Sequence, residues 1–318
     1  MGRRQIVRLV SNVLARTRMV GTLDRMNGRR GGVILVFHET TPEILQRQLD
    51  QIAQRYTFIS LDAFVDRLIA GKSTTGVCAI TFDDGIGSVT ETASALAITR
   101  GWPMTFYLPT RYLDTGEAYW FFELGLLLKR AAGANVVFER MALNLGSPAG
   151  IDRAWKILRG YFIALPSYDA VTHALRQLRS SLLGVEARPE GLDLPPPISW
   201  ERVRQLAHRD ELSFEAHTVS HLALSRLSDD HLIAEMEDSR ARIEEVTGRP
   251  VLHFCYPYGS PNEVGRVAPK HARSRFRSAT TTARGRCASG VDLALLPRIP
   301  LDIADPEAVV DFKVSSAR

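Results

Sequence analysis

Two adjacent carboxylates and two closely spaced histidines are the side chains best suited to carry chemistry in this sequence. Asp83 and Asp84 follow directly on an apolar run, and His217 and His221 follow a second short strand-like segment. Two imidazoles and one carboxylate can bind a divalent metal ion and leave open positions for water and a substrate. The remaining carboxylate would then stay ionised beside the metal, where it could accept a proton as a general base.

Each of these patterns also has a simpler explanation. Asp84-Gly85 is a common turn signal, and histidines four residues apart occur by chance in helices and turns. A tight turn, however, needs only one acid, and the adjacent carboxylates of Asp83 and Asp84 repel each other unless a cation lies nearby. Because both pairs follow strand-like segments, the metal site is the favoured interpretation.

Short β-branched and aromatic runs alternate with helix-length segments along much of the chain. The expected strands are residues 33–37, 57–61, 76–82, 103–110, 211–216 and 251–255. This alternation predicts parallel strands joined by right-handed helical crossovers. The loops at the carboxyl ends of such strands form one edge, where residues distant in sequence meet. His38 and Tyr258 also follow strands of this set, so we expect them at that edge.

Between residues 114 and 198 the alternation gives way to helical patterns with little strand signal. We interpret residues 114–198 as a helical insertion into a domain that extends over residues 33–310 and is followed by a tail at 311–318. A run of three prolines marks the end of the insertion, and Ser199 can cap the helix that comes next.

The chain has 318 residues, is 45% hydrophobic and carries a formal net charge of +5. Residues 1–32 contain eight arginines and one acid, so they carry the excess of positive charge, and they form an amphipathic arm. This arm could contact an anionic membrane, or cover the domain as a solvated helix. Its arginines interrupt every apolar run, so neither a secretory signal nor a membrane span is expected. We therefore expect a cytoplasmic protein, with peripheral membrane contact as an option. Nucleic acid is not an expected partner, because the sequence lacks reader motifs and aromatic interleaving.

Three motifs, in order and at strand ends, resemble the signature motifs of the polysaccharide deacetylases, the NodB-homology or carbohydrate esterase family 4 group. They are TFDDG at 81–85, HTVSH at 217–221 and YPYG at 256–259. Further similarity lies in VFHET at 36–40, ISW at 198–200 and LPRIP at 296–300. The resemblance covers roughly residues 33–301 apart from the insertion, and three ordered motifs make a specific signal.

The resemblance implies a distorted (β/α) barrel of about seven parallel strands and a divalent metal, with zinc as the expected ion. Asp84, His217 and His221 would be the metal ligands, and Asp83 the general base. The implied reaction is attack of metal-bound water on the N-acetyl group of an amino sugar in a polysaccharide or glycolipid precursor. The backbone N–H of Tyr258 would help the metal to hold the oxyanion.

The sequence departs from the family at two positions. Cys255 stands where many members have an arginine that braces the catalytic acid. Arg298, which we expect to follow a strand, is either its replacement or the partner of a structural acid. A late histidine that serves as general acid is also missing. His38 could replace it, or could be a structural histidine beneath the metal loops. These departures keep open a second hypothesis, a catalytically silent carbohydrate-binding relative.

The aromatic cluster at residues 119–123 bears on the substrate rather than on the reaction. Its side chains could stack on sugar rings, contact a lipid tail, or anchor the extra helices as a hydrophobic core. Together with the arginine-rich arm, the cluster leads to the hypothesis of a membrane-embedded glycolipid substrate.

Overall fold

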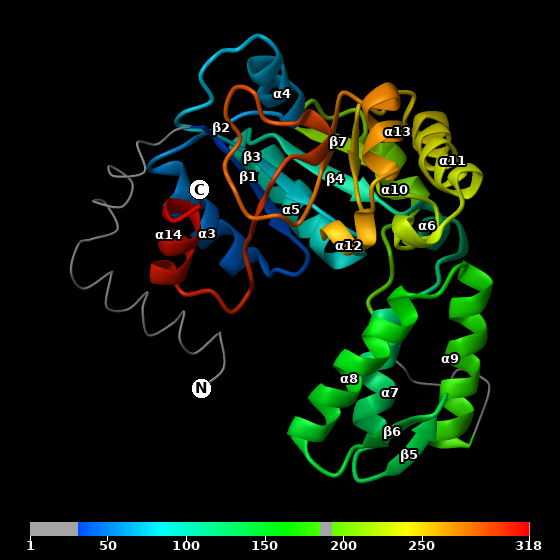
Figure 1. Cartoon of the computed structure of the whole chain (residues 1–318). Helices are drawn as coiled ribbons and strands as arrows, with labels where there is room; N and C mark the ends of the chain where they lie inside the picture. Colours follow the sequence, from blue (N-terminus) through cyan, green and yellow to red (C-terminus); the bar gives the residue numbers. More distant parts are fainter. Residues whose placement is uncertain (1–30, 185–192, 318) are drawn as a thin grey trace.

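The computed structural model describes residues 31–184 and 193–317, and the basic arm predicted at 1–32 lies outside this range except for Gly31 and Gly32. Figure 1 shows a larger part built of strands and helices, with the helices α7, α8 and α9 of the insertion standing beside one another below it. None of the described helices is long and apolar enough to cross a membrane.

The larger part is a parallel sheet curled into a half-barrel, as the sequence predicted (Figure 1). Its strand order is β10-β1-β3-β4-β7-β8-β9, and β2 adds to β3. The strands are β1 Val33–Phe37, β2 Thr57–Phe58, β3 Val77–Phe82, β4 Met104–Leu108, β7 Leu212–Ala216, β8 His253–Cys255, β9 Ser278–Thr280 and β10 Ile299–Pro300. Every ladder in this sheet is parallel.

Four phenylalanines lie next to one another across the centre of the sheet. Phe37, Phe82, Phe106 and Phe214 are direct neighbours on β1, β3, β4 and β7. Their rings stack at centroid distances of 5.1, 5.2 and 5.5 Å. Each stacked pair contributes about 0.5–1.5 kcal/mol beyond the area it buries. This ladder fixes the register, so the residues that follow β1, β3 and β7 emerge at the same edge.

Helices cover the outside of the half-barrel. They are α3 Pro42–Ala53, α4 Leu61–Ile69, α5 Gly87–Arg100, α6 Thr110–Thr115, α10 Trp200–Leu206, α11 Asp229–Thr247, α12 Pro261–Val264, α13 Ala268–Arg275 and α14 Glu307–Ser315. The predicted cap is present, since the Ser199 side chain accepts a hydrogen bond from the Arg202 N–H at the start of α10. Helix α14 crosses the boundary at residue 310 that separates the predicted domain from the predicted tail, and it packs against α3.

The insertion contains a β-hairpin as well as helices. Its elements are α7 Trp120–Arg130, β5 Asn135–Phe138, β6 Met141–Asn144, α8 Pro148–Ile163 and α9 Tyr168–Leu183. The hairpin turns at Glu139 and Arg140, whose φ angles of 45° and 63° are those of a turn usually made by Asn-Gly. Because neither residue is a turn signal and each strand has four residues, the sequence showed no hairpin there.

Candidate active site

The carboxylate of Asp84 and the imidazoles of His217 and His221 meet at the carboxyl edge of the sheet. The Nε2 atoms of His217 and His221 lie 3.6 and 3.1 Å from Asp84 Oδ1. One potential ligand atom from each residue lies within 4.8 Å of the other two, and all three side chains are buried. The structure thus brings together the three residues that the sequence predicted as metal ligands.

The ring of His217 is oriented by a hydrogen bond on its other nitrogen. His217 Nδ1 lies 2.7 Å from the backbone oxygen of Cys255, on the neighbouring strand β8. A neutral imidazole that donates from Nδ1 presents the Nε2 lone pair, which is the form a metal requires. The loop that carries His221 is closed by a 2.9 Å hydrogen bond from the His221 N–H to Thr218 Oγ1.

Strained backbone gathers at this edge. Six non-glycine residues in the described ranges have positive φ angles, and four of them lie here. They are Asp84 at 70°, Thr218 at 69°, His221 at 54° and Tyr258 at 61°. Each such conformation costs about 1–3 kcal/mol and persists only where the surrounding structure enforces it. The strained loops are therefore less stable locally, and the surrounding structure holds them where their side chains meet at the carboxyl edge of the sheet.

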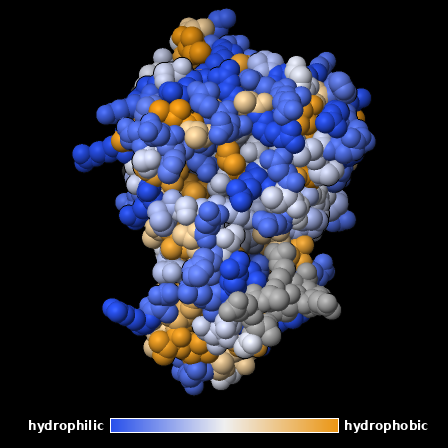
Figure 2. All heavy atoms as spheres, turned by 90° about the vertical axis from the view of Figure 1, so that its right-hand side faces the viewer, coloured by the Kyte–Doolittle hydropathy of each residue, from blue (hydrophilic) through white to orange (hydrophobic). Residues whose placement is uncertain are grey.

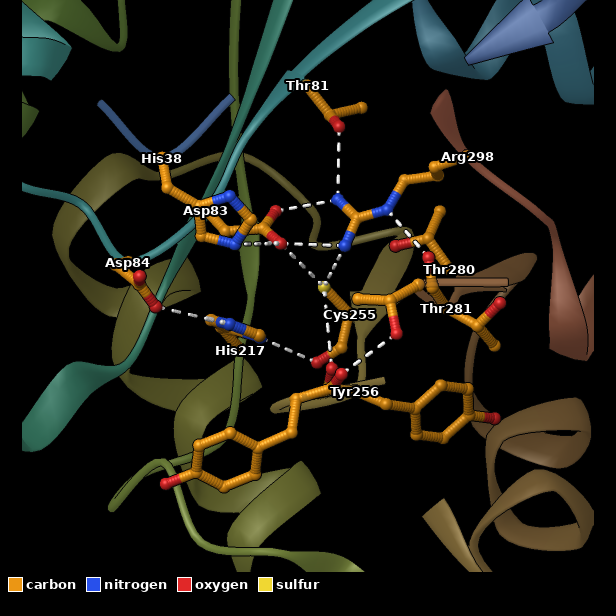
Figure 3. A network of polar contacts seen from close by, with 12 residues as sticks. His38, Thr81, Asp83, Asp84, His217, Cys255, Tyr256, Thr280, Thr281 and Arg298 are labelled. Carbon is orange, nitrogen blue, oxygen red and sulfur yellow. Dashed lines mark hydrogen bonds and ion pairs between the residues drawn. The ribbon is translucent and has the colours of Figure 1, made fainter. Parts of the chain in front are cut away.

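Asp83 lies beside the three-residue group and is held by Arg298 (Figure 3). Arg298 Nη1 donates to Asp83 Oδ1 at 2.7 Å, and Arg298 Nη2 donates to Asp83 Oδ2 at 2.6 Å. The guanidinium also donates to the Thr281 backbone oxygen and to Thr81 Oγ1. Burial raises the pKa of Asp83, but the charge and hydrogen bonds of Arg298 outweigh it and hold this pKa below its ordinary value. The carboxylate is therefore fixed and ionised.

Arg298 reaches Asp83 from a position in the fold that differs from the prediction. We expected Arg298 to follow a strand, whereas it immediately precedes β10. Strand β10 pairs with β1, and β1 pairs with β3, so Arg298 starts two strands away from Asp83. The Cys255 thiol lies 3.2 Å from Arg298 Nη2 and 3.5 Å from Asp83 Oδ2. A small side chain at residue 255 thus leaves room for a guanidinium that comes from the other side.

His38 and the Tyr258 backbone complete the predicted set. His38 is half exposed and its Nε2 lies 3.6 Å from Asp83 Oδ2, so it faces the open side of the site rather than lying beneath the loops. Within the described ranges, the Tyr258 N–H donates to no acceptor, and it is free to bind a ligand oxygen. The ring of Tyr258 packs edge-on against His221 at 4.9 Å.

Two residues that support the site were not predicted from the sequence. Glu235, in the second turn of α11, accepts hydrogen bonds from the N–H groups of Val219 and Ser220 at 2.9 and 2.8 Å. The Tyr119 hydroxyl donates to the backbone oxygen of Asp84. Glu235 resembles any other acid of a polar helix in the sequence, so only the packing of α11 against the loop could reveal its contact.

The donor set fits a divalent metal. Asp84 is ionised, because hydrogen bonds from His217 and His221 outweigh the effect of burial and hold its pKa well below the ordinary value. Two imidazole nitrogens and one carboxylate oxygen are ligands that zinc accepts. A second group, Asp83, His217 and Cys255, also lies within 4.8 Å. Both oxygens of Asp83 are already bound by Arg298, so the group that contains Asp84 is the better site.

Residues 70–273 match the sequence pattern of the family described as polysaccharide deacetylase, and the chain belongs to this family. No curated protein sequence matches this chain. Similar solved structures include a deacetylase, PplD, from Streptococcus pyogenes in complex with acetate, at 15% identity and a TM-score of 0.58, covering 89% of this chain and 98% of that one. IcaB from Ammonifex degensii has 15% identity and a TM-score of 0.54, covering 91% and 98%.

A third similar structure, the BpsB deacetylase domain from Bordetella bronchiseptica, has 14% identity and a TM-score of 0.54 and covers 86% and 97%. At these identities the structural matches establish the shared fold, and the activity of each neighbour remains its own. Membership of the family supports carbohydrate deacetylation as the reaction of this chain.

Proposed function

We propose that the protein hydrolyses the N-acetyl group of an amino sugar in a polysaccharide or glycolipid precursor, with one divalent metal held by Asp84, His217 and His221. Zinc is the metal that we propose. The observation that carries the proposal is the ionised Asp83 carboxylate, fixed by Arg298 beside a three-residue ligand group. A protein that only bound carbohydrate would have no need of this carboxylate, so the arrangement favours catalysis over the silent relative.

When bound, the metal would supply Lewis acidity that activates water and polarises the amide carbonyl. Asp83 would accept a proton from the attacking water, because its carboxylate is ionised and held in one orientation. The Tyr258 N–H would donate to the oxygen that becomes negative in the tetrahedral intermediate. Arg298 would position Asp83 without touching the substrate.

The departing nitrogen needs a proton before the C–N bond breaks. His38 is the group that we propose for this step, because it lines the open side of the site and its Nε2 lies 3.6 Å from Asp83 Oδ2. In its protonated form His38 can donate a proton to the departing nitrogen, and Asp83 can pass the proton taken from water to the neutral His38. The products are acetate and a free amino sugar.

Acetate release tests this function. The protein would be loaded with zinc and incubated with chitooligosaccharides, peptidoglycan fragments and lipid-linked N-acetylated amino sugars. We expect at least one class to yield acetate and free amine in equal amounts, and we expect His217→Ala to lose both the metal and the activity. Binding of these sugars without any acetate release would instead support the silent relative.

We also propose that the protein contacts a membrane at its surface through residues 1–32. Figure 2 shows apolar side chains near the lower end of the insertion, a second surface that would suit such a contact. Val137 and Ile157 are large apolar residues exposed on the insertion. Flotation with anionic vesicles, comparing the full chain with one that lacks residues 1–30, is the test. Absence of binding by both proteins, or equal binding by both, would contradict the proposal.

A further inference from the structure

A cleft of about 770 Å³ leads away from the candidate active site along the insertion. His38, Glu39 and Asp84 line its polar end, where the reaction would take place. Helices α7 and α8 stand side by side (Figure 1). They supply much of the rest of the cleft wall. The cleft is therefore continuous with the site and formed largely by elements of the insertion.

Helix α7 gives the cleft its length. Phe121, in the first turn of α7, lies with its ring 6.1 Å from that of His221, and Lys129 lines the cleft in the last turn. Eight residues at the helical rise correspond to about 12 Å. This distance is much longer than an acetyl group requires, so the cleft can hold a further part of the substrate.

The wall between these ends is mostly apolar. Ten of its seventeen lining residues have apolar side chains, with Phe122 and Leu126 on α7 and Ile151 and Trp155 on α8 among them. Asp152 also lines the cleft, but its charge is matched by an ion pair with Lys156 at 2.5 Å. The half-buried Phe121 and Phe122 thus form cleft wall, whereas Tyr119 and Trp120 of the same cluster are buried in the core.

Such a wall suits a hydrocarbon chain better than a row of sugar rings. Each sugar ring carries several hydroxyl groups, and a hydroxyl that leaves water without a new partner is unfavourable. A hydrocarbon chain needs no such partners, and each buried methylene strengthens binding by about fourfold.

Gly125 keeps the middle of the cleft open. It lies within α7, where glycine is less favourable than alanine, and it lines the cleft. A Cβ at this position would lie 3.9 Å from Trp155 Nε1, an ordinary contact distance. Alanine therefore fits, whereas a longer side chain at residue 125 would project into the space between α7 and α8.

We propose that this cleft binds the hydrocarbon chain of a glycolipid whose N-acetylated sugar lies at Asp84 and His38. This inference rests on the proposed function, because it identifies the substrate class of the same site. It assigns to the insertion the task of selecting a lipid-linked sugar over a free glycan.

Binding of alkyl glycosides tests the proposal without turnover. Ethyl, hexyl and decyl glycosides of N-acetylglucosamine, each below its micelle concentration, would be titrated into the zinc-loaded Asp83→Asn protein. We expect the affinity to rise at least about 100-fold from ethyl to decyl. Equal affinity for the three glycosides would overturn the proposal.

Variants of Gly125 show whether the hydrocarbon chain of the glycoside binds in this cleft. In Gly125→Leu the affinity should no longer rise with alkyl length, whereas in Gly125→Ala it should still do so. Gly160→Leu is the matched control, because Gly160 lies on α8 in open space and is exposed. If the affinity of Gly125→Leu still rises with alkyl length as in the parent protein, the hydrocarbon chain does not bind in this cleft. The same conclusion follows if Gly160→Leu loses the rise in affinity to the same extent. Circular dichroism would confirm that each variant is folded.

Two further arms separate the alternatives. A water-soluble methyl glycoside with an N-decanoyl group, and chitooligosaccharides of increasing length, would be titrated in the same way. An affinity that rises only with the N-acyl chain or with the number of sugars would overturn the proposal.

If wild-type protein releases acetate without any preference for alkyl length, the cleft proposal fails while the proposed function stands. If length-dependent binding occurs without hydrolysis, the cleft assignment stands and the proposed function fails.

Discussion

Arg298 and Asp83 form a buried, two-pronged ion pair, although 215 residues separate them in the sequence. Their hydrogen bonds of 2.7 and 2.6 Å match the planar fork of a guanidinium to the two oxygens of a carboxylate. Neither side chain is appreciably exposed, so the pair is protected from screening by solvent. Through this pair, strand β10 holds the proposed general base in place.

Removing Arg298 should change how activity depends on pH. Asp83 has a lowered pKa, so it remains a base until the pH falls through that value. Without the guanidinium, burial raises the pKa, and activity should already be lost at a higher pH in Arg298→Ala. The acid limb of the kcat/KM profile measures this shift. Arg298→Lys keeps the positive charge but cannot donate two parallel hydrogen bonds, so the acid limb of its profile should lie between those of the wild type and Arg298→Ala. An acid limb in Arg298→Ala at the same pH as in the wild type would refute the proposed role of Arg298.

The same variant should be less stable than the wild type. Truncation of one partner leaves the Asp83 carboxylate buried without its counter-charge, which costs about 3–5 kcal/mol of unfolding free energy. Urea unfolding near neutral pH gives this difference. Asp83→Asn, which removes the charge instead, serves as the comparison, and a loss below about 1 kcal/mol in Arg298→Ala would speak against a tightly coupled pair.

An arginine at residue 255 should rescue the loss of Arg298. Cys255 Sγ lies 3.5 Å from Asp83 Oδ2, so a guanidinium from β8 can approach the same carboxylate. Cys255→Arg alone should be harmful because two buried guanidinium groups would compete. In Arg298→Ala, however, it should restore kcat/KM by about tenfold or more, which a double-mutant cycle measures. Cys255→Ser is the control. Absence of coupling between Cys255→Arg and Arg298→Ala would show that only an arginine next to β10 can position Asp83.

Glu235 should contribute to metal affinity although it does not touch the ligand group. Its carboxylate accepts two backbone hydrogen bonds from the loop between His217 and His221. Glu235→Ala should weaken zinc binding by about 10-fold to 100-fold, because such supporting contacts orient the ligands. Competition with a chelator gives the affinity. Glu235→Gln retains an acceptor oxygen and should lose less, whereas unchanged affinity in Glu235→Ala would exclude the supporting role.

Glu215 should make the protein less stable as the pH rises. It is buried and accepts the N–H groups of Leu252 and His253 at 2.8 and 2.7 Å. Burial outweighs the charge of His253 and these hydrogen bonds, so its pKa is raised above 4.5. The folded state therefore holds the proton more tightly than the unfolded state, and stability falls as the pH rises from about 4.5 through the raised pKa.

Glu215→Gln tests this, because glutamine keeps the shape and does not titrate. Its unfolding free energy should not show this decrease over the same pH range, as measured by urea unfolding at several pH values. Identical pH dependence in wild type and Glu215→Gln would mean that Glu215 does not titrate in that window.

Much of the site could be predicted because its residues follow strand ends that the sequence marks clearly. His38, Asp83 and His217 come directly after β1, β3 and β7. Strands β1 and β3 are mainly apolar runs, and β7 alternates apolar with polar residues, so the sequence marks all three. The stacked phenylalanines hold the register, so the positions predicted on separate strands met in space.

The contacts that were missed or left open depend on packing between elements distant in sequence. The sequence left open whether Arg298 braces Asp83 or pairs with a structural acid, because their ion pair requires the order β10-β1-β3, which no local pattern in the sequence encodes. Glu235 meets its loop only because α11 packs on that side of the sheet. The hairpin of the insertion lacked a signal for another reason, since Glu139 and Arg140 adopt a turn that the sequence normally marks with glycine or asparagine.

The most direct test of the proposed function is acetate release by wild-type and Asp83→Asn proteins that carry the same amount of zinc. Asp83 is not among the proposed ligands, so Asp83→Asn should retain one zinc per chain. We predict that its turnover of an N-acetylated amino sugar falls by a factor of about 10²–10⁴, the contribution expected of a general base. Turnover close to wild type in zinc-loaded Asp83→Asn would contradict the central claim.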